Sequence, residues 1–309
     1  MLPTRQGSFR LFRFAGVDVY LHWSWFLIAA YQFSSPNGLL SSHYSSPGRK
    51  VLEYLSLFLI VLMHEFGHAL ACRSVGGQAS QIVLWPLGGV AYVSPPQRPG
   101  AMLWSIAAGP LVNVALFPIL TVLVMLNGGF DWTDALTAHA LLRDVWGINL
   151  LLLCFNLLPI YPLDGGQILR SLLWFMFGRA NSLMVASIIG FIGVAGLVLF
   201  ALFAQSVWLG ILCVFILLNC WRGLMQARVL ARVAKLPRRA GFACPECKTS
   251  PPIGDYWVCG QCRQAFDTFV TQGICPHCGT QFSTTRCLDC GSLRPMNEWM
   301  APPPFPPST

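Results

Sequence analysis

The amino-acid sequence predicts a mainly α-helical polytopic membrane protein, with about six transmembrane helices, a small membrane-surface β-sheet and two small four-cysteine zinc ribbons. Three observations predict this fold class. The 309 residues are 55% apolar and only 10% charged, and the mean hydropathy of +0.58 is too high for a soluble protein of this length. Long apolar stretches recur through the first 230 residues. Four Cys-x-x-Cys pairs follow them.

Changes in composition divide the chain into four parts. We predict a membrane-embedded domain over residues 1–230, a basic linker over 231–243, a double zinc ribbon over 244–292 and a Pro-rich disordered tail over 293–309. The linker carries Arg232, Lys235, Arg238 and Arg239, a composition suited to anionic lipid headgroups.

Within the first domain, alternation of apolar and polar residues predicts two short strands over residues 9–20, around Ala15-Gly16. The expected membrane helices cover about residues 21–33, 51–73, 102–126, 142–158, 183–204 and 207–223. A signal peptide is the alternative for residues 21–33, but no small-residue cleavage site follows, so we expect a retained anchor. Residues 79–93 are too short and too interrupted by Pro86 and Gly88-Gly89 for a span, and predict a hairpin at the membrane surface.

Six spans place both termini on one side of the membrane, and the basic residues indicate which side. Of the 20 Lys and Arg residues, thirteen fall in segments on that side and four in the tail domain. Only Arg49, Lys50 and Arg143 fall on the other side. By the positive-inside rule we predict a multi-pass protein of the cell membrane with both termini in the cytoplasm. The net charge of +8 is therefore a topology signal.

One motif in the second span carries chemistry. His64-Glu65-Phe66-Gly67-His68 places two imidazoles four residues apart on one helix face, close enough to bind a single zinc ion. Glu65 stands where a zinc-binding helix keeps its general base. The alternative is a pair of core histidines, but ionisable groups at membrane depth are costly and are usually functional.

A catalytic zinc site needs a third protein ligand and leaves its fourth position to water. Among the acidic residues before position 240, only Asp164 arrives at the depth and on the side of His64 and His68. Pro159 and Pro162, which come just before Asp164, unwind the chain there. Non-helical backbone in a membrane is tolerated mainly where it lines a cavity. A simple turn at a helix end is the alternative explanation of this segment.

These motifs resemble the site-2 protease family of intramembrane metalloproteases, in its six-helix bacterial branch. The resemblance covers about residues 9–228 and rests on HEFGH, on NLLPIYPLDG and on the GPLVN segment between them. It implies one catalytic Zn²⁺ bound by His64, His68 and Asp164, with Glu65 as the catalytic acid/base. It also implies that Asn156 helps to hold the substrate backbone or the oxyanion. The chain departs from the family in having no room for a PDZ domain after Gly89, and cysteine modules in place of a nucleotide-binding regulatory pair.

Two other polar residues in the spans have more modest interpretations. His22 lines the entry to the site by the resemblance, but an interfacial histidine with a satisfied hydrogen bond explains it equally well. Asn113 is interpreted as a structural, interhelical residue next to the site.

Eight cysteines near the C-terminus predict two structural zinc ions. We assign Cys244, Cys247, Cys259 and Cys262 to the first ribbon, and Cys275, Cys278, Cys287 and Cys290 to the second. Disulfides are the alternative, but they are rare in the reducing cytoplasm. Residues 244–290 hold three basic and four acidic side chains, so nucleic acid is a disfavoured ligand and a cytoplasmic protein partner is preferred.

The sequence therefore predicts a zinc-dependent endopeptidase that cleaves transmembrane protein substrates in or near their spans, while membrane lipids surround its first domain. A non-proteolytic membrane scaffold that binds a partner through its ribbons is the alternative, but an anchor has no need of the set formed by His64, Glu65, His68 and Asp164. A zinc transporter is a third hypothesis, which would need ligands along a path through the bilayer.

Overall fold

The structure is a computed structural model that describes residues 7–34, 47–85, 88–130 and 138–300. These residues form two compact units. The first contains the residues up to Met176 and Val185–Arg222, and the second contains Phe177–Met184 and the residues from Gly223 onward. The first unit holds the His64-to-His68 motif, and the second holds the Cys-x-x-Cys pairs.

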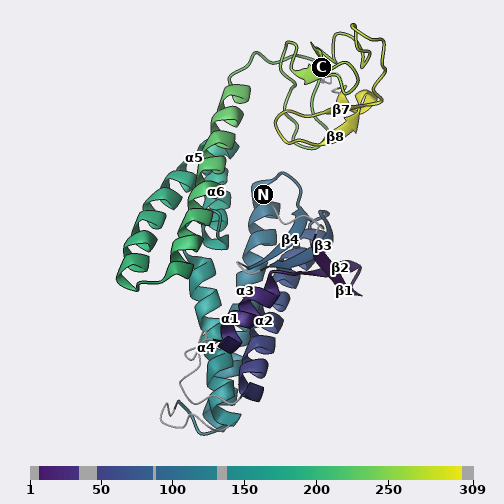
Figure 1. Ribbon diagram of the computed structural model, residues 1–309. Helices are drawn as coiled ribbons and strands as arrows, with labels where there is room; N and C mark the ends of the chain where they lie inside the picture. Colours follow the sequence, from purple (N-terminus) through teal and green to yellow (C-terminus); the bar gives the residue numbers. More distant parts are fainter. Residues whose placement is uncertain (1–6, 35–46, 86–87, 131–137, 301–309) are drawn as a thin grey trace, which may run out of the picture. The chain divides into compact units, whose positions relative to one another are not determined.

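Six α-helices make up most of the described chain (Figure 1). They are α1 (Trp25–Ser34), α2 (Pro47–Ser74), α3 (Pro99–Leu126), α4 (Ala138–Leu157), α5 (Asp164–Phe203) and α6 (Val207–Ala234). Five of them, α2 to α6, are long and apolar enough to cross a membrane within the described part of the chain. The prediction of a multi-pass helical membrane protein is confirmed.

The first expected span differs from the structure. Helix α1 has only 10 residues, so it rises about 15 Å, half the thickness of a bilayer core. It begins at Trp25 because the residues before it, through His22, extend as a β-strand. The apolar run that predicted a helix from Leu21 is therefore shared between a strand and a helix.

Helix α5 is also longer than expected, because the helix that begins at Asp164 continues into the predicted fifth span. Gly178 interrupts it with φ 74° and ψ 173°. This backbone conformation is open to glycine and strained for other residues. The 40-residue element is thus two helical segments joined at Gly178.

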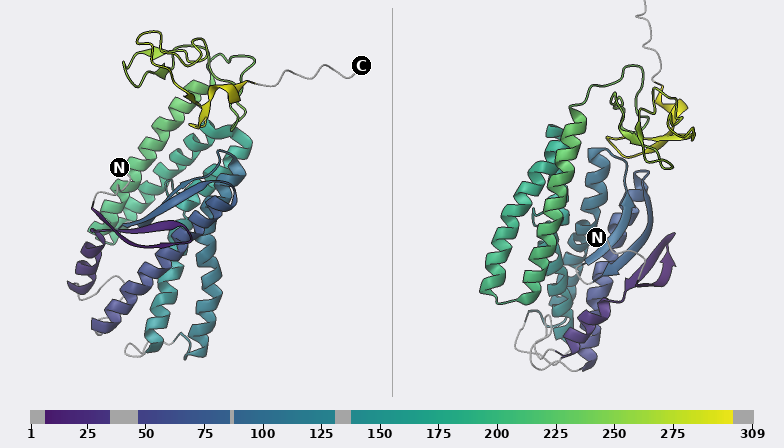
Figure 2. Two further views of the ribbon diagram at one scale, coloured as in Figure 1. Left: turned by 90° about the vertical axis from the view of Figure 1, so that its right-hand side faces the viewer. Right: turned by 45° about the horizontal axis from the view of Figure 1, so that its top comes forward.

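A four-stranded sheet lies against α2, as the left-hand view of Figure 2 shows. Its strands are β1 (Ser8–Phe14), β2 (Val17–His22), β3 (Gln78–Trp85) and β4 (Gly88–Ser94), in that spatial order. The predicted strand pairs are confirmed, and the parallel pairing of β2 with β3 joins them into one sheet. Alternate residues of the sheet, among them Val19 and Ile82, pack with Val61 and Leu62 of α2 in a common core.

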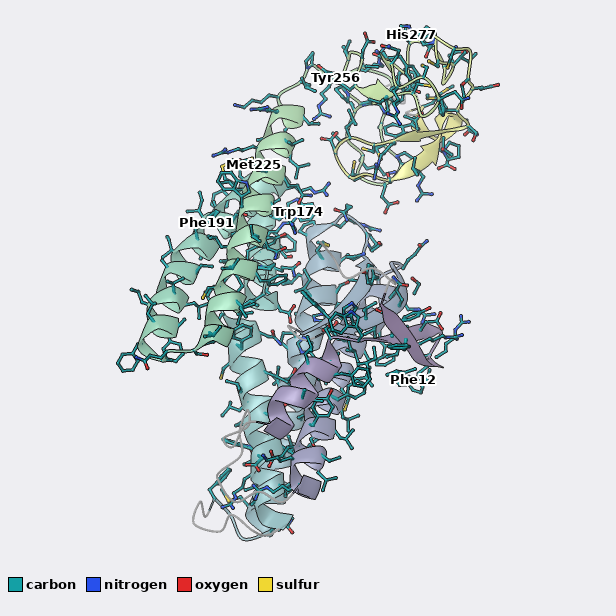
Figure 3. The ribbon with its side chains drawn as sticks, viewed as in Figure 1. Phe12, Trp174, Phe191, Met225, Tyr256 and His277 are labelled. Carbon is teal, nitrogen blue, oxygen red and sulfur yellow. The ribbon has the colours of Figure 1, made fainter. Side chains whose placement is uncertain are left out.

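Large apolar side chains point outward along the helices of the first unit (Figure 3). Phe203 is 88% exposed and Ile192 is 70% exposed. In water such a surface would be unstable, whereas in a bilayer it contacts the lipid acyl chains. This surface agrees with the assignment of α2 to α6 as membrane-crossing helices.

The second unit is small and rich in turns. It contains two short hairpins, β5 (Trp257–Val258) with β6 (Ala265–Phe266) and β7 (Thr284–Arg286) with β8 (Leu293–Pro295). Its core contains Trp257, Phe269 and Trp299 beside the cysteines.

The prediction of a disordered tail from residue 293 is partly wrong. Strand β8 and the 3₁₀ helix at Met296–Trp299 are ordered, and Trp299 is fully buried in the core. The aromatic residue anchors this segment, although the prolines around it suggested disorder. Residues 301–309 lie outside the described residues.

Candidate active site and metal centres

Three predicted ligand atoms converge inside the first unit. His64 Nε2 lies 3.0 Å from Asp164 Oδ2 and 3.1 Å from His68 Nε2, and His68 Nε2 lies 3.4 Å from Asp164 Oδ2. Two ligands of a tetrahedral zinc ion, at bond lengths of about 2.0–2.1 Å, are separated by about 3.3–3.4 Å. The triangle therefore has the dimensions of three corners of a zinc site.

The outer nitrogens of both imidazoles have hydrogen-bond partners. His68 Nδ1 donates to the backbone carbonyl of Ser105 at 2.9 Å, and His64 Nδ1 lies 2.6 Å from Asn113 Oδ1. With hydrogens on Nδ1, both Nε2 lone pairs face the carboxylate of Asp164. Three acceptors pointing at one another repel unless a cation lies between them, so this donor set fits a metal ion.

Gly109 of α3 provides the space at this site. A Cβ at position 109 would lie 2.2 Å from His68 Nε2 and 2.8 Å from His64 Nε2. Glycine is thus the residue that lets α3 approach the two ligand nitrogens without filling the metal position.

We expect Gly109→Ala to abolish binding of the active-site zinc, because the added methyl group overlaps both ligand nitrogens. The matched control is Gly147→Ala on α4, where an added Cβ meets no atom within 4 Å. Zinc per purified chain, measured by elemental analysis, should fall by one ion in Gly109→Ala and stay unchanged in Gly147→Ala. Equal zinc in both variants would show that Gly109 does not border the metal.

Glu65 is buried, and strand β4 holds its carboxylate. Glu65 Oε2 accepts a hydrogen bond of 2.9 Å from the Ala91 N–H, and the residue is 6% exposed. A Cβ at Gly89 would lie 2.2 Å from Glu65 Cγ. The hairpin thus packs directly on the candidate general base, with glycine at the point of closest approach.

Asp164 reaches the site from a tightly folded segment between α4 and α5. A Cβ at Gly165 would lie 2.3 Å from the Leu157 carbonyl oxygen, and one at Gly166 would lie 2.4 Å from the Ile160 carbonyl carbon. The two glycines after Asp164 therefore let the start of α5 pack against the end of α4. This turn puts the carboxylate of Asp164 within reach of α2.

The other predicted polar residues have different positions. Asn156 lies half-buried near the end of α4, and its contact with a substrate stays a prediction. His22 ends β2 and its Nδ1 contacts the Ser24 hydroxyl, which satisfies the histidine locally. Asn113 lies next to the site as expected, and it bonds directly to His64. Asn149, which bonds Asn113, was missed by sequence reasoning.

The eight ribbon cysteines form two clusters, but the predicted grouping is wrong. Cys244 and Cys247 cluster with Cys287 and Cys290, and the inner pairs 259/262 and 275/278 form the other cluster. Sulfur–sulfur distances of 3.7 and 3.8 Å in the first and 3.6 Å in the second match tetrahedral zinc, whose Zn–S bonds of about 2.3 Å separate sulfurs by about 3.8 Å. The first and last pairs meet because the β5–β6 hairpin folds the chain back between them and the Ala243 N–H bonds the Trp299 carbonyl.

All four Cys-x-x-Cys turns share one backbone geometry. The residue after the second cysteine donates its N–H to the carbonyl of the first cysteine, at 2.8–3.0 Å. That residue has a positive φ in every case; the four are Lys248, Arg263, Gly279 and Gly291. In the exposed turn at Cys278, a hydrogen bond from the Thr280 hydroxyl lowers the pKa of the thiol to about 6, which favours the thiolate form that binds metal.

The basic linker is only partly available to lipid headgroups. Arg238 forms a two-point ion pair with Asp289 at 2.7 and 3.0 Å, and this hydrogen bonding raises the pKa of Arg238 above its usual value. Arg239 pairs with Asp267 at 2.5 Å. These two arginines therefore stabilise the fold of the ribbon, because each forms an ion pair with an acidic residue that is distant in the sequence.

Apolar membrane-crossing helices around two histidines, an aspartate and a glutamate define a membrane-embedded metalloprotein. The model of peptidase family M50 matches residues 53–146 and 133–200. The chain belongs to this family, which is the site-2 protease family, and the predicted resemblance is confirmed.

Individual relatives agree with this assignment. A zinc metalloprotease of Methanocaldococcus jannaschii is 32% identical over 211 residues, which are 68% of this chain and 58% of the relative. A putative zinc metalloprotease of Synechocystis is 31% identical over 182 residues, which are 57% of this chain and 47% of the relative. The chain thus spans about half the length of these relatives. The solved structure of a site-2 protease from Methanocaldococcus jannaschii matches with a TM-score of 0.52 and 27% identity, over 70% of this chain and 95% of that one.

Proposed function

We propose that this chain is a zinc-dependent endopeptidase that cleaves peptide bonds in or near transmembrane segments of other membrane proteins. The observation that carries the proposal is the 3.0–3.4 Å triangle of His64, His68 and Asp164, inside a unit built from apolar helices. The family model and the metalloprotease relatives support the same class of reaction.

The residues around the triangle have distinct roles in this reaction. One zinc ion bound by His64, His68 and Asp164 would supply Lewis-acid activation of water and of the peptide carbonyl. Glu65 takes a proton from the attacking water and delivers it to the leaving amine nitrogen. The hydrogen bond from the Ala91 N–H orients the Glu65 carboxylate for this transfer. Asn156 is proposed to hold the substrate backbone or the oxyanion.

The substrate is proposed to bind along strand β4. A peptide bond inside a helix is shielded by its own hydrogen bonds, so the scissile segment must first unwind. Strand β4 is the outer strand of the described sheet on the side of Glu65, and an unwound segment could pair with it by strand addition. That position would put the peptide bond beside Glu65.

Both termini are proposed to lie in the cytoplasm. Strand β1 and strand β3 belong to one sheet, and Arg73, near the end of α2, donates a hydrogen bond to the Ala15 carbonyl. The N-terminal strands thus lie at the Ser74 end of α2. The next four helices, α3 to α6, are each long and apolar enough to cross a membrane, and four crossings would return the chain to the same side. The positive-inside rule favours the cytoplasm for that side, where the ribbons are proposed to bind a protein partner.

The test compares cells that carry the wild type with cells that carry Glu65→Gln. We expect at least one transmembrane protein to be cut in the wild-type cells and to persist uncut in the variant, because glutamine cannot accept the proton. Quantitative proteomics of the membrane fraction measures this, with immunoblots confirming equal amounts of both enzymes. Identical membrane-protein profiles would contradict the protease and favour the scaffold function.

A further inference from the structure

Two buried asparagines connect the candidate metal site to helices α3 and α4. Asn113 and Asn149 are both 0% exposed. Asn113 Nδ2 donates to Asn149 Oδ1 at 2.9 Å, and Asn149 Nδ2 donates to the backbone carbonyl of Asn113 at 3.0 Å. Asn113 Oδ1 then faces His64 Nδ1 at 2.6 Å.

The backbone carbonyl fixes every direction in this chain of hydrogen bonds. A carbonyl oxygen can only accept, so the atom of Asn149 that faces it must be the NH₂ group. Asn149 Oδ1 therefore faces Asn113 and receives its NH₂ group. Asn113 must then present Oδ1 to His64, and His64 must carry its hydrogen on Nδ1. The lone pair of His64 Nε2 is left for the metal.

Of the two histidine ligands, only His64 has a side-chain amide as the partner of its Nδ1. His68 Nδ1 donates to the Ser105 backbone carbonyl, which cannot rotate to present a donor. His64 instead depends on a side-chain amide, which could rotate and present its NH₂ group to Nδ1. That rotation would move the hydrogen of His64 to Nε2 and block metal binding.

We propose that Asn149 is a positioning residue of the metal site: it holds the amide of Asn113 in the one orientation that keeps His64 Nε2 free to bind the ion. Asn149 acts through Asn113 and has no role in the chemical step. The inference rests on the metal-binding part of the proposed function. Partners that orient a metal-bound histidine typically change metal affinity about 10–100-fold when they are removed.

The test is a chelator titration of the full chain, with zinc retained per chain as the readout. Asn149→Leu removes both hydrogen bonds to Asn113 and is expected to weaken the active-site zinc about 10–100-fold. The matched control is Trp146→Phe, which deletes another α3–α4 hydrogen bond, from Trp146 Nε1 to Thr121 Oγ1 at 2.9 Å. We expect less than about a threefold change in zinc affinity there, because this bond includes neither Asn113 nor a metal ligand, and the loss of one interhelical hydrogen bond typically changes helix association only by about that factor. Equal zinc affinity in these two variants would overturn the proposal.

A conservative variant separates orientation from packing. In Asn149→Asp, the neutral carboxyl group offers one acceptor to Asn113 Nδ2 and one hydroxyl donor to the Asn113 carbonyl, so we expect zinc affinity within a few-fold of the wild type. Loss of zinc in Asn149→Asp equal to that in Asn149→Leu would also overturn the proposal.

The wild type and His68→Ala serve as references, because His68→Ala retains only the zinc of the cysteine clusters. Equal zinc in these two proteins would contradict the proposed function itself. One additional zinc in the wild type, with unchanged affinity in Asn149→Leu, would contradict the role of Asn149 alone.

Discussion

Asp164→Ala is expected to remove one zinc ion per chain and to lower the rate of substrate cleavage by more than about 10³-fold. The carboxylate oxygen lies 3.0 Å from His64 Nε2 and 3.4 Å from His68 Nε2, so its loss opens one corner of the triangle. Two imidazoles alone leave a site short of the three protein ligands of a catalytic zinc. Cleavage assays and elemental analysis of the same purified samples measure both effects.

Comparison with Glu65→Gln separates metal binding from proton transfer. Glu65→Gln should also lose cleavage but keep the full zinc content, because Glu65 is not a member of the triangle. The variant that combines Asp164→Ala with Glu65→Gln should cleave substrate no more slowly than either single variant, since residues that act as one unit have non-additive effects. Zinc loss in Glu65→Gln, or full zinc with active protein in Asp164→Ala, would contradict the assigned roles.

The grouping of His64, His68 and Asp164 at the candidate active site was largely predictable, because the residues that point to it are close in sequence or have few competitors. The spacing of His64 and His68 fixes one helix face, and the shortage of acidic residues in the spans isolated Asp164. The role of Asn149 could not be predicted in this way. An asparagine in an apolar helix has many uses, and its hydrogen bonds to Asn113 depend on how α3 packs against α4.

The differences between the predicted and the observed fold also arise where local sequence allows two structures. Residues 21–33 are mostly apolar, with His22, Ser24 and Gln32 as the polar exceptions, and such a composition suits both a strand and a membrane helix. The parallel pairing of Leu21 with Leu84 favours the strand for the first residues of this run. Trp299 likewise is an isolated aromatic residue in a Pro-rich sequence, and only the folded ribbon shows that it fills the core.

The pairing of the cysteine turns could not be read from their spacing. Four similar turns, with gaps of eleven, twelve and eight residues, allow neighbouring or nested clusters. The choice depends on contacts between distant residues, such as the hydrogen bond of 2.9 Å from Trp257 Nε1 to the Arg286 carbonyl. The structure selects the nested arrangement.

Two serine variants with equal numbers of substitutions should distinguish nested from neighbouring clusters. Replacing the cysteines at 244, 247, 287 and 290 removes all ligands of one nested cluster, so we expect the loss of one ribbon zinc. Replacing those at 244, 247, 259 and 262 removes two ligands from each cluster, so we expect the loss of both. Elemental analysis of the full chain measures the difference, and neighbouring clusters would give the reverse result.

The variant that lacks the cysteines at 244, 247, 259 and 262 should lose most of the stability of the second unit. Binding of a structural zinc ion supplies about 10–16 kcal/mol of folding free energy, which equals or exceeds the whole stability of a typical domain. Loss of both ions should therefore unfold the second unit and expose Trp257 and Trp299, which are 8% and 0% exposed in the fold. Limited proteolysis after residue 243 would detect this. The active-site zinc should remain in place, because none of its ligands belongs to the second unit.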